Sequence, residues 1–407
     1  EIKMNQAYIV DAVRIPRARA KGKEGAYGKL KPVELLEPLF HAIAARNQLD
    51  SHQVEDVLLG CNTQTDQQGA NLAKISALYA GWPDKVSGGT INRFCCSGLD
   101  AINIGAAKIL SGMESLVVAG GVEKISSVPM FSDNGPWFSD PKVIQKTRFL
   151  HMGLAADLIA QQQDYSRETL DELALQSHQR AAHASKNNYF SNSLVPIKDK
   201  LGNPILNQDD SIRENINIEK LAQLPASFSA FTEAGQKVVD QVYPQDKLQA
   251  LHSAGNSPAL VDGASLVLLA SEQKCSELNL KPRARIRHFA NASDEPVKML
   301  TGHICAMEKM LAATGLKASD IDLWEVNESF AASVLNFQKH FKISDSQINV
   351  NGSAIAMGHP LGATGGNLLG MLLDELERQQ KKLGVIAICG GAGVGVVTLI
   401  ERIDLAP

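Results

Sequence analysis

Two stretches of this chain follow the same plan, and that repetition limits the fold more than any other feature. From Ala7 to about residue 125, apolar runs typical of strands alternate with segments of helical spacing, and they end in Val117–Gly121. The same alternation resumes after Ser253 and ends in the similar run Ile386–Gly391. Continuous apolar runs are typical of buried strands, and strands that alternate with helices form a sheet covered by helices. We therefore predict an α/β protein made of two similar halves.

An inserted region separates the two halves. Residues 126–251 are more polar, include the Asn/Asp/Gln-rich stretch 198–210, and contain one clear amphipathic helix at Arg167–Lys186. These features are typical of a loop-rich insertion. We therefore predict three units: residues 1–125 with 253–277 returning to them, an inserted loop domain over 126–252, and residues 278–407.

The composition excludes several classes of protein. Lys and Arg number 40 against 44 Asp and Glu, which gives a net charge of −4 without the basic excess of nucleic-acid binders. Hydrophobic residues make up 44%, too many for a disordered chain, and 6 cysteines are too few for a disulfide scaffold. Residues 346–373 and 384–400 lack charged side chains, but glycines interrupt both, so we predict buried core and no membrane span. The N-terminal residues lack the basic and apolar regions of a secretory signal, which favours a reducing, cytoplasmic location.

The first candidate for chemistry is Cys95, in the segment NRFCCSGL at residues 92–99, where a predicted strand gives way to a helix. A thiol at a helix N-terminus is expected to have a lowered pKa and to act as a nucleophile. The backbone N–H groups there can also form an oxyanion hole. On this segment alone, a pair of small buried side chains at Cys95 and Cys96 is the commoner explanation. We expect no metal site, because no second Cys/His pair lies at ligand spacing.

Three further residues stand at predicted ends of elements. His359 lies in the glycine-rich, uncharged stretch 349–366, where a rigid turn suits a general base, although an incidental histidine in a glycine-rich turn is the alternative. Cys389 ends a buried strand beside glycines, and alone it is better explained as core. Asn327 stands where a strand leads into a helix, and alone an ordinary helix cap explains it better.

Together these segments resemble the thiolase family. The matching segments are NRFCCSGL at 92–99, NESFA at 327–331, NGSAIAMGHPLGATG at 351–365 and CGGAGVG at 389–395. The resemblance runs over essentially the whole chain and is greatest to the bacterial fatty-acid-oxidation branch, often labelled acetyl-CoA acetyltransferase. It implies a thiolase-like fold of two similar α-β-α-β-α layered halves with an inserted, CoA-binding loop domain. It also implies thiolytic cleavage of a 3-oxoacyl-CoA, or the reverse Claisen condensation, by a ping-pong acyl-enzyme mechanism.

The resemblance assigns catalytic roles to five residues. Cys95 would be the acylated nucleophile, and His359 would take the proton from its thiol. Cys389 would be the second thiol, which exchanges a proton with the α-carbon of acetyl-CoA. His359 and a water positioned by Asn327 would hold the enolate, while the backbone N–H groups of Cys95 and Gly391 would hold the oxyanion of the acyl thioester.

The resemblance also implies contacts with coenzyme A, which is a substrate here, so no permanently bound cofactor and no metal are expected. His151 and Met152 would line the pantetheine tunnel, and Arg213 and Lys220 would contact the adenine nucleotide. For Arg213, a solvated surface arginine is nearly as good an explanation. Further contacts are implied at Ser253, Ala254, Ser257 and Phe330. The partners it implies are a second copy of the chain, as a homodimer or homotetramer, and a hydratase/dehydrogenase of fatty-acid oxidation.

Some positions depart from the family's pattern, and other functions remain open. The departures are at Pro258, His303, Ser329 and Ser353. A 3-oxoacyl-synthase shares the fold but would replace Cys389, and the Asn327-Glu328 pair also argues against it. A non-catalytic acyl-CoA or lipid carrier would be expected to have lost one of the catalytic residues. A metal-binding or redox dithiol protein is the third alternative.

Overall fold

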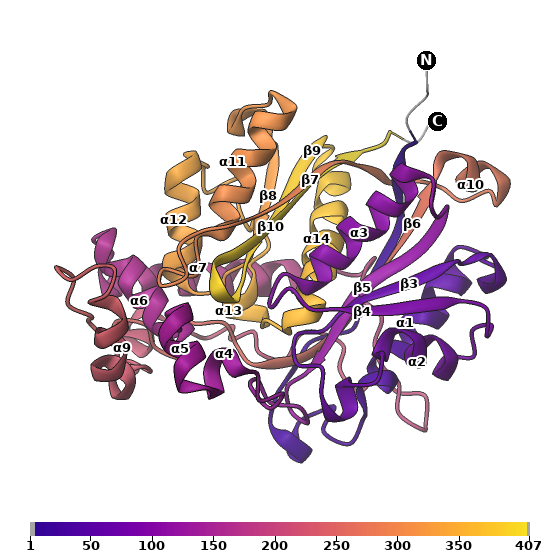
Figure 1. Ribbon diagram of the computed structural model, residues 1–407. Helices are drawn as coiled ribbons and strands as arrows, with labels where there is room; N and C mark the ends of the chain where they lie inside the picture. Colours follow the sequence, from indigo (N-terminus) through magenta and orange to yellow (C-terminus); the bar gives the residue numbers. More distant parts are fainter. Residues whose placement is uncertain (1–4, 405–407) are drawn as a thin grey trace.

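The computed structural model describes residues 5–404. The first four residues, on which the expectation about a secretory signal partly depends, and the last three, which end the third predicted unit, lie outside that range. The described chain forms one mixed sheet with helices on its faces (Figure 1). The strands are β1 (Ala7–Arg14), β2 (Ala18–Arg19), β3 (Asp56–Gly60), β4 (Ser87–Ile91), β5 (Leu116–Lys124), β6 (Val261–Ser271), β7 (Ala284–Ser293), β8 (Leu323–Val326), β9 (Leu383–Cys389) and β10 (Val394–Arg402).

The sheet repeats one pairing pattern on either side of its centre. Its order is β4-β3-β5-β6-β1-β7-β10-β9-β8, with β2 paired to β6. In the first half, β1–β6 and β6–β5 are antiparallel and β5–β3 is parallel. In the second half, β7–β10 and β10–β9 are antiparallel and β9–β8 is parallel. The predicted α/β fold with two similar halves is therefore confirmed. Within the sheet, the halves join where β1 pairs with β7, Tyr8 with Arg285 and Ile9 with Ala284.

Helices form the remaining layers. The helices of the two halves are α1 (Pro32–Arg46), α2 (Leu72–Tyr79), α3 (Ser97–Ser111), α10 (Glu272–Glu277), α11 (Gly302–Thr314), α12 (Ala331–Phe341), α13 (Ala354–Met357) and α14 (Thr364–Gln379). Helices α3 and α14 pack side by side between the two halves of the sheet, and a single apolar cluster combines their side chains with those of both halves (Figure 1). The central helical layer is therefore shared.

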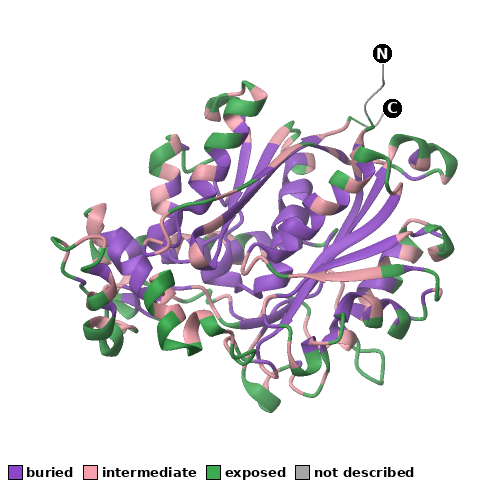
Figure 2. Ribbon diagram, viewed as in Figure 1, coloured by how far each residue is buried: buried purple, intermediate pink, exposed green. Residues whose placement is uncertain are grey.

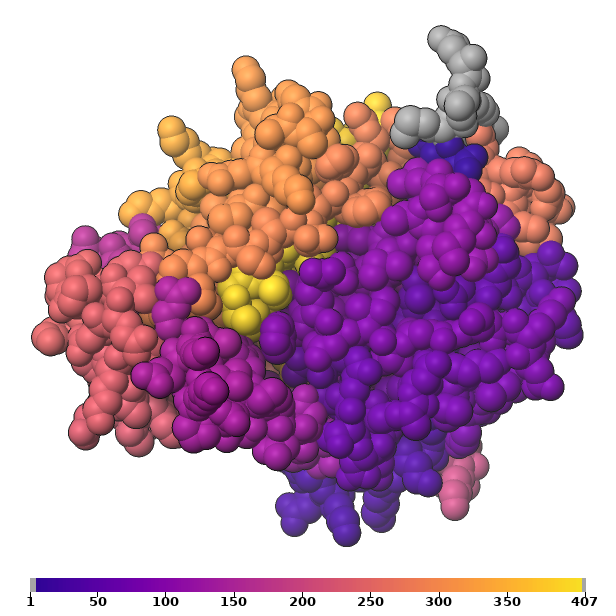
Figure 3. Space-filling view, viewed as in Figure 1, coloured from indigo at the N-terminus to yellow at the C-terminus, as the bar shows by residue number. Residues whose placement is uncertain are grey.

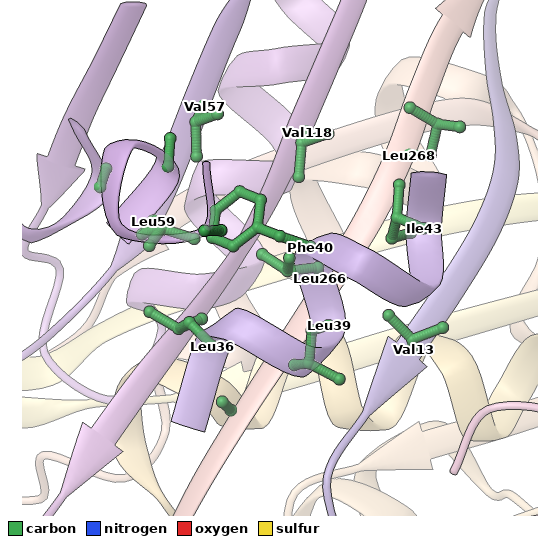
Figure 4. Packing of buried hydrophobic residues seen from close by; sticks show 14 of the residues in the cluster. Val13, Leu36, Leu39, Phe40, Ile43, Val57, Leu59, Val118, Leu266 and Leu268 are labelled. Carbon is green, nitrogen blue, oxygen red and sulfur yellow. The ribbon is translucent and has the colours of Figure 1, made fainter. Parts of the chain in front are cut away.

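The outer face of the first half shows why the apolar spacing produces this layering. In α1, Leu36, Leu39, Phe40 and Ile43 recur at helical spacing and are fully buried. Figure 4 shows them packed on strand residues such as Val57, Val118 and Leu266. Burial of such side chains contributes roughly 1.5–3 kcal/mol each. Figure 2 shows most strands of both halves buried, with exposed residues in the loops and on the outer helices.

The inserted region contains more helix than the sequence predicted. Besides the expected α7 (Arg167–Lys186), it forms α4 (Pro136–Ser139), α5 (Pro141–Thr147), α6 (Met152–Gln162), α8 (Ile218–Ala222) and α9 (Thr232–Val239). Helix α6 was missed because it is almost entirely buried and therefore lacks an amphipathic pattern. No helix within the described range is both long and apolar enough to cross a membrane. The exact boundaries of the three units remain a prediction.

Candidate active site

The N-termini of α3 and α14 meet in the central layer, and glycines make this possible. A Cβ atom on Gly98 would overlap the carbonyl oxygen of Gly362, and one on Gly365 would overlap the backbone nitrogen of Leu99. Only glycine permits backbones to approach this closely. The contact brings together the segment before α3, which holds Cys95, and the segment before α14, which holds His359.

Cys95 lies two residues before α3, after Phe94, whose backbone has a φ of 51°. Its thiol lines a small pocket of about 50 Å³ together with Gly391. The backbone N–H groups of Cys95 and Gly391 face the sulfur and favour the thiolate. Burial nevertheless raises the pKa of Cys95 to about 12, and the nearby Cys389 and Glu123 add to the effect.

The expectation of a lowered pKa at Cys95 is therefore wrong. The helix N-terminus and the N–H groups are visible in the local sequence and lower the pKa. Burial and acidic neighbours distant in sequence are not visible there, and they raise it. At neutral pH the residue is a thiol, so nucleophilic attack requires a base that removes its proton.

His359 has the properties of such a base. Its Nδ1 lies 2.7 Å from Oγ1 of Thr364, so with Nδ1–H as the donor, Nε2 is left as an acceptor. Nε2 is buried and has no hydrogen-bond partner within residues 5–404. Burial lowers the pKa of His359 to about 4, and the positive charge of Arg17 contributes. The imidazole is thus neutral at neutral pH and able to accept a proton.

Arg17 connects the His359 turn to the inserted region. Its Nη1 donates to the carbonyl oxygen of Gly358 at 3.2 Å, and its Nε donates to Oδ1 of Asp209 at 3.1 Å. Asp209 also accepts two hydrogen bonds from Arg14, at 2.9 and 3.0 Å. All three charged side chains are about 1% exposed. A buried charge network of this kind fixes the backbone immediately before His359.

Cys389 and Asn327 are buried, line neither cavity and are linked through Ser329. The Cys389 thiol donates to Oγ of Ser329 at 3.3 Å, and Nδ2 of Asn327 donates to the same oxygen at 3.1 Å. Oδ1 of Asn327 is buried and unpaired in the described structure. Burial raises the pKa of Cys389 to about 11, so it too is a thiol at neutral pH. Ser329 was noted in the sequence only as a departure, because this contact depends on the tertiary fold.

Two adjoining cavities collect most of the predicted binding residues. A cleft of about 540 Å³ is lined by His359 and by the predicted CoA contacts His151, Arg213, Ala254, Ser257 and Phe330. The predicted contact Met152 lines the smaller pocket beside Cys95. Met130 and Leu361 line both cavities, which shows that the two adjoin. Neither of these two residues was singled out from the sequence.

Two predicted CoA contacts do not reach the cleft. Lys220 is exposed, and its Nζ lies 3.4 Å from the carbonyl oxygen of Asn215. Ser253 is fully buried, and its Oγ accepts from the backbone N–H of Gly255 at 3.1 Å. Their contacts with CoA remain predictions. Asn327, Cys389 and Ser253 line neither cavity.

The cleft also contains basic residues that the sequence reasoning missed. Arg19 and Lys21 line it together with Arg213. The available signal was the local run of basic residues at 17–23, RARAKGK. His178 supports this edge, because its Nδ1 accepts from the backbone N–H of Arg213 at 3.0 Å. No cluster of three or more potential metal ligands occurs among the described residues.

Comparison with known proteins gives consistent matches over the whole chain. A family model described as "Thiolase, N-terminal domain" matches residues 7–237, and "Thiolase, C-terminal domain" matches residues 280–402. Among curated relatives, the 3-ketoacyl-CoA thiolase of Photorhabdus laumondii is 36% identical over 98% of this chain and 100% of its own length. That of Serratia proteamaculans is 37% identical with the same coverage. The crystal structure of Bacillus anthracis acetyl-CoA acetyltransferase has a TM-score of 0.85 and 33% identity, covering 98% and 99% of the two chains.

Proposed function

The chain belongs to the thiolase family and is a CoA-dependent acyltransferase, and we propose that it cleaves 3-oxoacyl-CoA with Cys95 as the residue that carries the acyl group. The products are acetyl-CoA and an acyl-CoA shortened by the acetyl unit, and the reverse reaction is a Claisen condensation. The observation that supports this proposal most strongly is made at the junction of α3 and α14. There, Cys95 and His359 line adjoining cavities, and Nε2 of His359 has no hydrogen-bond partner among the described residues.

In the first half-reaction, Cys95 attacks the 3-oxo carbonyl carbon while His359 Nε2 accepts the thiol proton. The bond between the α-carbon and that carbonyl carbon breaks, and its electron pair passes to the enolate of acetyl-CoA. The Cys389 thiol then protonates the α-carbon. Acetyl-CoA leaves, with the acyl group on Cys95, a proton on His359 and a thiolate at Cys389. The high pKa of Cys389 supports its role as a donor, since it remains protonated until the carbanion forms.

In the second half-reaction, Cys389 accepts the proton of the CoA thiol, and the resulting thiolate attacks the acyl carbon. The sulfur of Cys95 leaves and regains its proton from His359, which restores all three groups. The N–H groups of Cys95 and Gly391 stabilise the carbonyl oxygen of the acyl thioester during attack. A water held by the free Oδ1 of Asn327 joins His359 in binding the enolate oxygen of acetyl-CoA.

We place the CoA nucleotide at the basic edge of the larger cleft. Arg19, Lys21 and Arg213 supply local positive charge there, although the chain carries a net charge of −4. The pantetheine arm runs past Phe330 and Ala254 toward His359. CoA takes part as a substrate, and the proposal requires no permanently bound cofactor.

We propose that two copies associate through the edge strand β4. This strand ends the sheet, and its residues are partly or fully exposed. The adjacent α2 exposes Ile75, Leu78 and Tyr79 by 39–48%, and apolar side chains beside an unpaired strand are typical of an interface. Sedimentation should give at least a dimer, and Tyr79→Glu should weaken it. A cytoplasmic location and a hydratase/dehydrogenase partner remain predictions from the family resemblance.

Mass measurement of the intact protein after mixing with acetoacetyl-CoA tests the proposal. We expect an acetyl adduct on Cys95 that free CoA removes, and no adduct in Cys95→Ala. A protein that binds CoA but forms no adduct would be a carrier. An adduct at another cysteine would assign the nucleophile elsewhere.

A further inference from the structure

The small pocket beside Cys95 is lined in part by a group of aromatic side chains. Four of its lining residues are Phe94, Phe131, Trp137 and Phe138. Their rings contact one another: the centroids of Phe94 and Trp137 lie 5.0 Å apart, and those of Phe131 and Phe138 lie 4.7 Å apart. Phe94 immediately precedes Cys95, whereas the other three belong to the start of the inserted region. Helices α4 and α5 of that region lie at the surface beside the yellow C-terminal segment in Figure 3.

Trp137 limits the free space in this pocket. The volume beside Cys95 is about 50 Å³, compared with about 540 Å³ for the adjoining cleft. Ligand pockets for larger molecules typically have roughly 300–1,000 Å³. A Cβ atom on Gly391 would lie 2.9 Å from the Trp137 ring and 3.0 Å from Phe94. The rings are therefore packed closely on the backbone that faces the Cys95 sulfur.

The charge of the pocket restricts the ligand further. Asp133 is the one charged residue among the described residues that line it. Within residues 5–404, no Lys or Arg lines this pocket, whereas the basic residues Arg19, Lys21 and Arg213 line the larger cleft. An anionic group that entered the small pocket would lose hydration without gaining a cationic partner.

We propose that this pocket receives the acyl tail and selects short, uncharged, apolar acyl groups, with Trp137 limiting the length and Asp133 excluding anionic tails. The inference depends on the proposed acylation of Cys95, because the tail extends from that sulfur. Met130 and Leu361, which line both cavities, separate the tail from the pantetheine arm.

The first test compares kcat/KM for 3-oxohexanoyl-CoA and 3-oxodecanoyl-CoA with free CoA. We expect the longer substrate to be poorer by at least about tenfold, since pocket misfits of this kind are worth roughly 10–200-fold. Equal values for the two substrates would overturn the length limit.

The Trp137→Ala variant then tests which residue sets the limit. We expect the ratio of kcat/KM for the longer to the shorter substrate to rise by about tenfold or more. Trp137→Leu is a milder second variant and should change the ratio in the same direction. Phe341→Ala is the matched control, because Phe341 is also a half-buried aromatic residue with ring contacts but lines neither cavity. An unchanged ratio in both Trp137 variants would overturn the assignment.

A second pair of substrates tests the charge. 3-Oxoadipyl-CoA has the same acyl chain length as 3-oxohexanoyl-CoA but ends in a carboxylate, and we expect its kcat/KM to be lower by about tenfold or more. Asp133→Asn should reduce this difference by up to about fivefold, as expected for an exposed charge. The exposed Asp84→Asn serves as the control. Equal use of both substrates by the native protein would contradict the inference.

Failure of this inference is distinct from failure of the proposed function. Acetoacetyl-CoA has the shortest tail and requires little of the pocket. If it is cleaved through Cys95 while longer or anionic tails are accepted equally, the acyl-enzyme mechanism stands and only the pocket assignment is wrong.

Discussion

The two halves share a pairing pattern but treat the ends of their parallel strands differently. At the end of β3 and β5, the buried Glu123 accepts hydrogen bonds from the backbone N–H groups of Asn62 and Thr63, both at 3.1 Å. The Cys61 thiol also donates to it at 3.1 Å. The corresponding end of β8 and β9 leaves Oδ1 of Asn327 unpaired among the described residues, and the Cys389 thiol has only hydroxyls as side-chain partners there, Ser329 at 3.3 Å and Ser333.

Under the proposed mechanism, this difference distinguishes a structural strand end in the first half from a reactive one in the second. Buried polar groups are normally hydrogen-bonded, so an unpaired one requires an explanation. In the second half, the unpaired atoms of Asn327 and His359 can bind substrate or water. The first half contributes Cys95 from a helix N-terminus. The carboxylate at its own strand end, Glu123, is hydrogen-bonded.

The largest expected effect is on the reactive strand end itself. Cys389→Ala should lower turnover of 3-oxoacyl-CoA by about 10²–10⁴-fold, the usual contribution of an acid or base. Acylation of Cys95 by acetyl-CoA should persist, although more slowly, because CoA can leave as a thiolate whereas the carbanion of the cleavage step requires a proton donor. Steady-state kinetics and mass measurement separate the two steps. Full turnover in the variant would give the second thiol no catalytic role and remove the contrast between the strand ends.

The next effect concerns the charge network that links the first half to the His359 turn. Arg17→Met leaves part of the charge of Asp209 unpaired, and breaking such a buried pair costs about 3–5 kcal/mol of unfolding free energy. The variant should also raise the pKa of His359, because the positive charge of Arg17 contributes to lowering it.

The pH dependence distinguishes this role from a merely structural one. In the native protein, His359 can accept a proton above a pKa of about 4. In Arg17→Met, the acid limb of kcat/KM should move to higher pH. A less stable variant with an unchanged acid limb would limit Arg17 to a structural role.

A smaller effect is expected at the contact between the two central helices. Gly98→Ala places a methyl group against the Gly362 backbone and should cost about 1–3 kcal/mol of stability, with a further loss of activity as Cys95 and His359 separate. Gly370→Ala in α14 is the matched control, since its Cβ would lie 3.5 Å from the nearest atoms. That substitution should be neutral or stabilise the helix by up to about 1 kcal/mol. Denaturant unfolding measures both, and equal stability of the two variants would show that the junction tolerates a side chain.

The smallest effect at neutral pH concerns His303, a buried histidine that lines neither cavity. It is fully buried against Phe337, and neither ring nitrogen makes a hydrogen bond of normal geometry in the described range. Burial lowers its pKa from 6.5 to about 3. Because the unfolded chain binds a proton that the folded chain does not, His303 destabilises the fold increasingly as pH falls from about 6.5 toward 3.

Replacing His303 tests whether every unpaired group marks a reactive site. His303→Phe should be more stable than the native protein by about 2 kcal/mol at pH 5, with little difference at pH 8. Its kcat/KM should be unchanged, because His303 lines neither cavity. A large loss of activity would extend the functional region into the outer layer of the second half.

The sequence predicted what depends on local pattern and failed where distant residues decide. The two halves could be predicted because strand runs and helical spacing are local. Cys95 and His359 could be singled out because each lies beside special backbone in a recognisable segment. The direction in which the pKa of Cys95 is shifted could not be predicted, because it depends on burial and on Cys389, which is far away in the chain.

The same limit explains the missed neighbours of the site. The contacts of Ser329 with Cys389 and of Arg17 with Gly358 join residues that are far apart in the chain, so the local sequence could not show them. Helix α6 gave no periodic signal because nearly all of it is buried. Lys220 was included from its position in the chain; its side chain does not line the cleft, and its contact with CoA remains a prediction.

The glycine contact between α3 and α14 has an evolutionary consequence. Gly98 and Gly365 would touch no substrate, yet substitution there should disturb both members of the nucleophile–base pair at once. Selection on catalysis would therefore act on these two positions as strongly as on reacting groups. The residues at corresponding strand ends of the two halves can differ, as Glu123 and Cys389 illustrate. A side chain at the glycine junction, in contrast, would separate the two halves.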